Sequence, residues 1–249
     1  MKRDSNKSTT VLKALRVMET VSELDGHASA NAVATAMKID RATAYRMLKT
    51  LEDAGYLSMV PDTKAFQVTN RILALARPVL NKMDQTEWID TILRAVTRRT
   101  GETCHYSEIS GLETVLLRRN KGTQLVAVDF TIGQKCELHA TSIGKAILAY
   151  QSPTFVDDYV KLEMRAYTDL TVTTADALRA ELAKVRREGI SYDLEELAEG
   201  MNCVAVPVRL INGDVRGGVS ISGPKLRLTP DRLREIGEIM LEEVTAVSV

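Results

Sequence analysis

The spacing of apolar residues changes twice along the chain. Apolar positions recur every three or four residues up to residue 54, and again between residues 71 and 100, which is typical of amphipathic helices. From residue 101 they form short runs bounded by glycine-containing turns, with helical stretches between them. Runs of strands with helices interspersed predict an α+β domain around one sheet, preceded by a helical region.

Three helices and a hairpin are predicted in the first 70 residues. Ser8 to Thr10 can cap a first helix that ends at Asp25-Gly26, and its stripe is Val11, Leu12, Leu15, Met18, Val21 and Leu24. A second helix covers residues 30–37 after Ser29, and a third covers residues 41–54 after Asp40. Residues 56–60 and 65–69 follow as two strands, which makes the region a winged helix-turn-helix.

The third helix exposes a face of cations, hydroxyls and an aromatic ring. We expect DNA to bind Arg41, Thr43, Tyr45, Arg46 and Lys49 of this face, with Lys64 at the tip of the hairpin. The alternative is a solvated helical domain with ordinary surface charges. The chain has no net charge, but its first 80 residues carry 12 basic against 8 acidic side chains, and this sign favours DNA.

Domain boundaries are expected at residues 1–70 for the winged helix-turn-helix, 71–85 for a linker helix and 86–249 for the larger domain. Pro78 falls inside the helical pattern, and the polar residues 81–86 form the softest boundary. Apolar faces on such a connector often meet a second copy of the chain. A homodimer or homotetramer is therefore expected, as DNA half-site symmetry also requires.

The larger domain is expected to hold five strands and four helices. The strands are at residues 103–109, 114–118, 125–130, 203–210 and 215–221, and the helices at 142–151, 153–160, 174–188 and 230–244. No apolar run reaches the ~18–20 residues of a membrane span, and the N-terminus lacks a signal peptide. We therefore expect a cytoplasmic protein without membrane contact, whose three cysteines stay reduced.

Three segments of the larger domain could hold a ligand. Residues 138–146 enter a helix, so backbone N–H groups near Thr141 could bind a carboxylate, although capping by Thr141 or Ser142 is the more common role. Four carboxylates follow within residues 193–199, most of them expected to be solvated. Cys203 reads as a small buried thiol, and the hydroxyls of Ser220 and Ser222 point to one side of a strand.

A metal-binding or hydrolytic enzyme is the alternative function. Cys136 and His139 have the spacing of a ligand pair, whereas Cys104 and His105 are adjacent on a strand and face opposite sides. The chain contains neither a Gly-x-Ser-x-Gly elbow nor a phosphate-binding loop. We expect no catalytic residues, no metal and no cofactor.

The helix-turn-helix resembles that of the IclR family of regulators, and the resemblance runs from Thr9 onward. It rests on the segment SANAVATAMKIDRATAYRMLKTLEDAGYL, with its Thr-x-Tyr-Arg core and Leu-Glu-x-x-Gly-Tyr end. It implies a regulator that binds double-stranded operator DNA and a GAF-like domain that binds a small organic acid or aromatic effector. The effector positions that it implies are Ser142, Ile143, Asp193, Cys203, Ser220 and Ser222. Ile143 is bulkier than the glycine or alanine of many members, which favours a small or flat effector.

Overall fold

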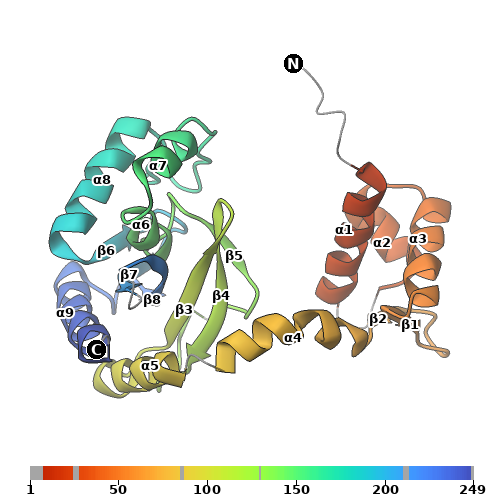
Figure 1. Cartoon of the computed structure of the whole chain (residues 1–249), viewed down its shortest axis with the longest axis horizontal. Helices are drawn as coiled ribbons and strands as arrows, with labels where there is room; N and C mark the ends of the chain where they lie inside the picture. The colour runs from red at the N-terminus through yellow and green to blue at the C-terminus, as the bar shows by residue number, and fades with distance from the viewer. Residues whose placement is uncertain (1–7, 25–27, 85–86, 129, 210–212, 248–249) are drawn as a thin grey trace. The chain divides into compact units, whose positions relative to one another are not determined.

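The computed structural model describes residues 8–24, 28–84, 87–128, 130–209 and 213–247. The chain forms two compact units, one ending at residue 85 and the other beginning at residue 86. Figure 1 labels their helices and strands. No helix within the described ranges is both long and apolar enough to cross a membrane.

The first unit is a winged helix-turn-helix, as the sequence predicts. It contains the helices α1 (Thr9–Glu23), α2 (Ala30–Met37), α3 (Arg41–Asp53) and α4 (Arg71–Asp84), and the antiparallel strands β1 (Leu57–Met59) and β2 (Phe66–Val68). Ser8, Ser29 and Asp40 cap the first three helices by accepting backbone hydrogen bonds. The predicted end of the first helix at Asp25-Gly26 lies outside the described residues.

The core of this unit lies between the first three helices and the hairpin. Val17, Val21, Val33, Ala44 and Leu48 are buried there. The predicted apolar stripe of α1 is only partly buried, because its N-terminal half is exposed. The exposed members are Val11, Leu12 and Leu15, each at least 50% exposed.

The connector continues through Pro78 as one helix, α4, and α5 begins at Glu87. Proline removes one backbone hydrogen bond from a helix, but it does not end this one. Three apolar residues at the start of α4 are exposed: Ile72, Leu73 and Leu75.

The second unit is an α+β domain around one sheet. Its antiparallel sheet has the strand order β5-β4-β3-β8-β7-β6. The strands are β3 (Cys104–Ser110), β4 (Glu113–Asn120), β5 (Lys135–Glu137), β6 (Ser191–Leu194), β7 (Met201–Arg209) and β8 (Val215–Pro224). The helices are α5 (Glu87–Thr100), α6 (Ser142–Leu148), α7 (Pro153–Tyr159), α8 (Ala175–Glu188) and α9 (Pro230–Val247).

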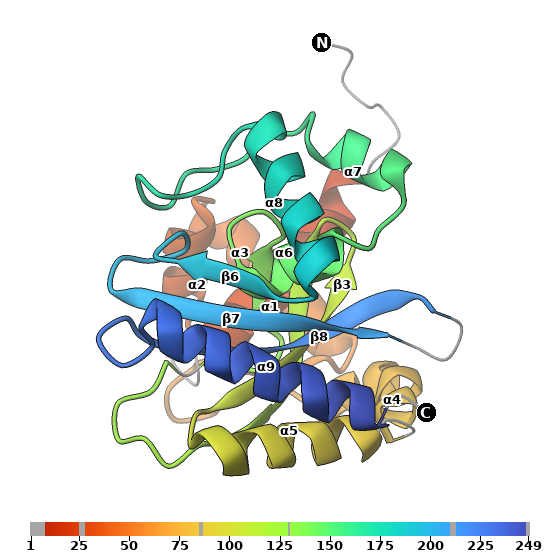
Figure 2. The same ribbon diagram turned by 90° about the vertical axis from the view of Figure 1, so that its left-hand side faces the viewer.

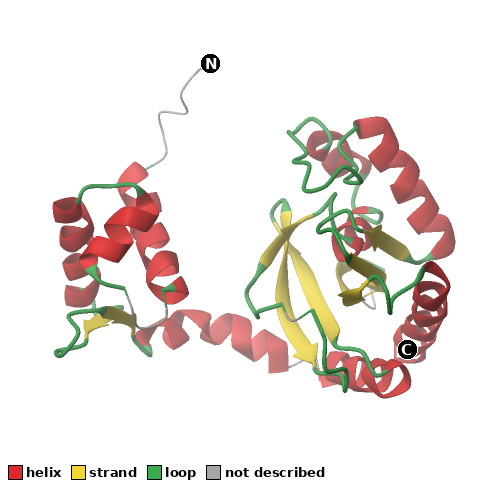
Figure 3. Ribbon diagram, turned by 180° about the vertical axis from the view of Figure 1, so that it is seen from behind, coloured by secondary structure: helices red, strands yellow, loops and turns green. Residues whose placement is uncertain are grey.

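Helices cover both faces of this sheet. The long helices α5 and α9 lie side by side on one face, and α6 packs against β7 and β8 on the other (Figure 2). Figure 3 shows the same arrangement from behind, with α7 and α8 outside α6. Because apolar residues of β3, β7 and β8 pack against α5 and α9, the main core lies on that face. The α6 face of the sheet is left to carry polar side chains.

One predicted strand is wrong and two strands were missed. Residues 125–130 form no strand in their described part, and Leu125 and Val126 are exposed. A side chain holds this segment instead, because the guanidinium of Arg227 donates a hydrogen bond to the carbonyl of Val126 over 2.8 Å. The missed strands, β5 and β6, are the two sheet edges and only three and four residues long. Such short segments carry little periodicity.

Candidate functional site

The start of α3 is fixed by a tight turn and a cap. Lys38 adopts a left-handed conformation with φ of 54°, which ends α2 and turns the chain into α3. Oδ1 of Asp40 accepts a hydrogen bond from the backbone N–H of Thr43 over 2.8 Å, and this bond lowers the pKa of Asp40. Ala44 and Leu48 anchor α3 in the core, so the opposite face points outward.

The six residues expected to contact DNA divide into two groups and one outlier. Arg41, Tyr45 and Lys64 line one hollow between α3 and the hairpin. Thr43 and Arg46 line a second hollow beside α1. Lys49 forms an ion pair with Glu52 one turn further along α3.

Sequence reasoning missed four polar neighbours of these groups. Ser29 and Asn31 at the start of α2 share the hollow of Arg41 and Lys64, and Thr10 and Lys13 of α1 share that of Arg46. Only the packing of α1 and α2 against α3 brings these residues together. In the sequence, only their position at the start of two predicted helices could have indicated that they lie near α3.

The six implied effector positions line one cavity on the α6 face of the second unit. The lining set contains Ser142, Ile143, Asp193, Cys203, Ser220 and Ser222. The centre of a water molecule can occupy a volume of about 40 Å³ inside this cavity. A single ordered water needs ~10–15 Å³ in that measure, so only a small ligand fits without movement of the walls.

Strand register places four of these residues, Asp193, Cys203, Ser220 and Ser222, next to one another on the sheet. Asp193 of β6 pairs with Cys203 of β7, and Cys203 pairs with Ser222 of β8. Ser220 lies two residues back on the same face of β8, and it pairs with His105 of β3. With His105, the set therefore crosses four neighbouring strands, which explains how residues more than 100 positions apart meet.

The carboxyl group of Asp193 is buried at one end of this set. Its Oδ1 accepts hydrogen bonds from the backbone N–H groups of Glu196 and Leu197, over 2.7 and 3.3 Å. Its Oδ2 is buried without a hydrogen-bond partner among the described residues. Burial raises the pKa of Asp193 to about 6, because the ionised form loses its hydration.

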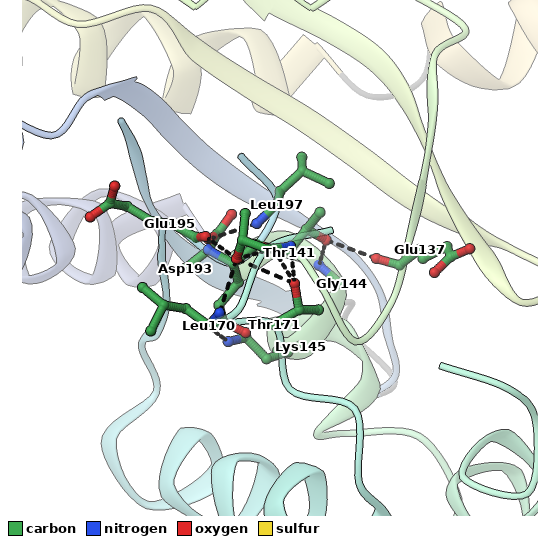
Figure 4. Close-up of polar contacts among 11 residues, drawn as sticks. Glu137, Thr141, Gly144, Lys145, Leu170, Thr171, Asp193, Glu195 and Leu197 are labelled. Atoms are coloured by element: carbon green, nitrogen blue, oxygen red, sulfur yellow. Dashed lines mark hydrogen bonds and ion pairs between the residues drawn. The ribbon is translucent and has the colours of Figure 1, made fainter. Parts of the chain in front are cut away.

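A second buried group holds the turn that carries these N–H donors. The ammonium of Lys145 on α6 forms an ion pair with the carboxylate of Glu196, and the Lys145 side chain is 1% exposed. The hydroxyl of Thr171 donates to the Glu196 carbonyl over 2.6 Å. Figure 4 shows Lys145 and Thr171 on one side of this turn and Asp193 within it.

The start of α6 supplies the opposite wall of the cavity. Thr141 caps the helix, since its hydroxyl accepts from the N–H of Gly144 over 3.0 Å and donates to the carbonyl of Glu137 over 3.1 Å. Gly144 permits close packing, because a Cβ there would lie 2.4 Å from the Leu138 carbonyl oxygen. The side chain of Ile143 lines the cavity and lies close to Gly218. A Cβ added at Gly218 would lie 2.7 Å from Cδ1 of Ile143.

One expectation about titratable groups needs correction, and the two residues of the alternative ligand pair can be compared. Asp193 and Glu196 are buried rather than solvated, at 0% and 8% exposure, whereas Glu199 is exposed as expected. Cys136 and His139 lie in different surroundings. Cys136 lines the cavity, and burial raises its thiol pKa to about 11. His139 instead contacts the hydroxyl of Tyr159 at 3.0 Å and the carbonyl of Arg165 at 2.9 Å.

No metal-binding constellation supports the enzyme alternative in the described part of the chain. No group of three or more histidine, cysteine, aspartate or glutamate side chains could hold an ion there. Cys104 and His105 face opposite sides of β3, as predicted: Cys104 lies in the main core and His105 lines the cavity. The two residues could not ligate one ion together.

The cavity wall contains residues that sequence reasoning did not select. The remaining lining residues are His105, Ser107, Thr114, Leu116, Phe130, Gln134, Cys136, Thr141 and Leu197. His105 and Ser107 could have been found, because alternation along their strand places both on the face of Ser220 once the register is known. No lysine or arginine is among the described residues that line the cavity.

Comparison with known proteins matches both units. The family model described as the IclR helix-turn-helix domain matches residues 10–61, and the model described as the bacterial transcriptional regulator IclR C-terminal domain matches residues 77–249. The "Probable transcriptional regulator SauR" of Cupriavidus necator is 30% identical over 230 residues, which cover 92% of this chain and 91% of that protein.

Solved structures agree with the fold. The crystal structure of the Thermotoga maritima IclR has a TM-score of 0.74 at 28% identity, covering 96% of this chain and 97% of that one. An IclR homologue from Microbacterium hydrocarbonoxydans, crystallised with 4-hydroxybenzoate, has a TM-score of 0.80 at 21% identity, covering 96% and 98% of the two chains. With two family models that together span most of the sequence, this chain belongs to the IclR family of bacterial transcriptional regulators.

Proposed function

We propose that this regulator binds double-stranded operator DNA through α3 and the β1–β2 hairpin, and a small organic acid in the cavity of its second unit. One observation carries the effector half: all six effector positions implied by the family resemblance line a single buried cavity. The solved homologue with 4-hydroxybenzoate supports an acid as the ligand class. The small volume and the bulk of Ile143 favour a short acid over a large aromatic one.

The DNA half rests on exposure and charge. Arg41, Tyr45 and Arg46 are exposed on α3, while the opposite side of the helix is buried. Helix-turn-helix proteins place such a face in the major groove, and a wing residue such as Lys64 reaches the backbone or minor groove. This unit would act in the cytoplasm, on DNA, without catalysis.

A second copy of the chain fits the uncovered apolar residues. Val11, Leu12 and Leu15 on α1 and Leu73 and Leu75 on α4 are exposed in the single chain. Burying a leucine side chain contributes about 1.5–3 kcal/mol, so self-association through these helices is favourable. We propose a homodimer, or a homotetramer built from it, that reads a near-palindromic operator.

An effector regulates only if its affinity differs between the DNA-bound and free states of the protein. The experiment is a titration of the DNA upstream of the regulator's own gene with purified protein across a salt series, with and without short and aromatic monocarboxylates. We expect a specific complex that weakens steeply with salt and changes with at least one acid. Salt-insensitive or absent binding would refute the DNA half, and a complex indifferent to every small molecule would refute the effector half.

A further inference from the structure

The effector cavity combines an unsatisfied carboxyl group with an absence of cationic side chains. Asp193 is fully buried, and its Oδ2 has no hydrogen-bond partner among the described residues. The lining set contains neither lysine nor arginine in the described part of the chain. The thiol of Cys203 interacts with this carboxyl group from the neighbouring strand, but a thiol is a weak donor and does not replace a stronger hydrogen bond. The cavity therefore contains a buried hydrogen-bond acceptor that lacks a strong donor.

The charged and titratable groups around Asp193 do not neutralise a second anion. Lys145 is the cation that interacts with Asp193, and it forms a buried ion pair with Glu196. The thiols of Cys136 and Cys203 have pKa values raised by burial, so both are neutral near pH 7. The groups that interact with Asp193 are Lys145 from α6, Glu196 from the turn after β6, Cys203 from β7 and Cys136 from β5. His105 of β3 lines the same cavity.

A carboxylate ligand would meet the Asp193 carboxylate in this small space. Two carboxylates that share a water-poor site cannot both stay ionised, because their repulsion is not screened. One proton held between them converts the repulsion into a charge-assisted hydrogen bond. Hydroxyls of Ser220 and Ser222 are available on the same face for the remaining oxygen lone pairs.

We propose that a carboxylate effector enters this cavity together with one proton, which bridges an effector oxygen and Oδ2 of Asp193. The inference rests on the proposed function, because it assumes that the effector is an acid. The balance is simple: an effector anion, an Asp193 carboxylate and a proton from solvent form a hydrogen-bonded pair with a single negative charge. Binding is then linked to pH.

The sign of the linkage follows from the site. A short acid is ionised throughout pH 6–8, and Asp193, with a pKa of about 6, is increasingly ionised across this range. The proton must therefore be taken from solvent as pH rises, and the affinity for the acid falls by up to about tenfold per pH unit. A neutral amide of the same shape brings its own N–H donor, so its affinity should stay nearly constant.

The test compares acids with their amides at several pH values. Isothermal titration would use a series of monocarboxylates from acetate to benzoate and the matched amides from acetamide to benzamide, each at pH 6, 7 and 8. Titrations at pH 8 in two buffers of different ionisation enthalpy count the protons taken up. We expect uptake of about one proton with the acid that binds, and an acid-to-amide affinity ratio that falls toward pH 8.

Two variants assign the proton. Asp193→Asn keeps the Oδ1 acceptor of the turn and adds a donor at the other position, so it should bind the acid without proton uptake and without the pH trend. Glu199→Gln removes an exposed carboxylate from the same segment and should behave like the unmodified protein. If Asp193→Asn does not fold, the buffer and amide comparisons on the unmodified protein still decide.

The outcomes separate this inference from the proposed function. Acid binding without proton uptake overturns the inference and leaves effector binding intact. Uptake that persists in Asp193→Asn also overturns it, because the proton would then belong to another group such as His105. Binding of amides but of no acid overturns the proposal that the effector is an acid, although the cavity remains a binding site. No binding by any compound, with operator affinity unchanged, overturns both.

Discussion

The two units of this regulator present their functional residues in opposite ways. In the first unit the candidate DNA contacts are exposed or half-buried side chains on α3 and one hairpin, all within 24 residues of sequence from Arg41 to Lys64. In the second unit the candidate effector positions are buried and come from α6, β6, β7 and β8. An extended anion is met by an open surface, whereas a small ligand requires a closed cavity that only a complete sheet can form.

The charge balance of the two sites differs in the same way. Arg41, Arg46 and Lys64 are exposed, so their charges are hydrated in the free protein. In the second unit Lys145 is completely buried and depends on one partner, Glu196. Substitution of the exposed cations of the first unit should therefore affect affinity, whereas substitution of Lys145 in the second unit should affect stability.

Lys145→Met should have the largest effect, on stability. It leaves the Glu196 carboxylate buried without its cation, which typically costs about 3–5 kcal/mol. The single tryptophan of the chain, Trp88, packs against the core of the second unit, so its fluorescence during urea unfolding reports on that unit. The double variant Lys145→Met/Glu196→Leu should regain most of the lost stability. Unchanged unfolding of the single variant would show that the ion pair has no structural role.

Arg46→Ala should weaken operator binding without changing the stability of either unit. Loss of a base or phosphate contact costs about 1–3 kcal/mol, and a lost phosphate contact also reduces the salt slope by about one. The measurement is an operator titration at matched salt. Lys161→Ala removes an exposed charge from the second unit and serves as the control. Equal operator affinity of Arg46→Ala and the parent would remove Arg46 from the interface.

Ser222→Ala should have the smallest effect, confined to the effector. A lost hydrogen bond in a buried cavity costs about 1 kcal/mol, or roughly a fivefold loss of affinity for the acid that binds. Operator binding in the absence of effector should not change. Ser110→Ala, at the exposed end of β3, is the matched control. An effector titration that Ser222→Ala leaves unaltered would place the ligand elsewhere.

The contrast between the units also explains which features the sequence alone could predict. The winged helix-turn-helix follows from local signals: Ser29 and Asp40 directly precede the second and third predicted helices and cap them, and the predicted polar face of α3 lies opposite the buried Ala44 and Leu48. The cavity depends on strand register, which no local pattern specifies. The residues Ser220 and Ser222 were found from alternation and the family resemblance, but His105 and Phe130 were missed.

Burial of the acidic segment could not be foreseen for a related reason. A run such as residues 193–199 is usually solvated, and only the packing of α6 and Thr171 against it shows that Asp193 and Glu196 are enclosed. The apolar run 125–130 was wrongly predicted to be a strand. It has the composition of a strand, but it pairs with no strand in its described part.

The most direct test of the account measures coupling in both directions. If the acid in the cavity changes operator affinity by some factor, operator DNA must change the affinity for the acid by the same factor. We would titrate the acid into free protein and into the operator complex, and compare the ratio with the shift in operator affinity that the acid produces. The account predicts equal factors. Equal acid affinity for the free and DNA-bound protein would contradict it, because the cavity would then hold a ligand that cannot regulate.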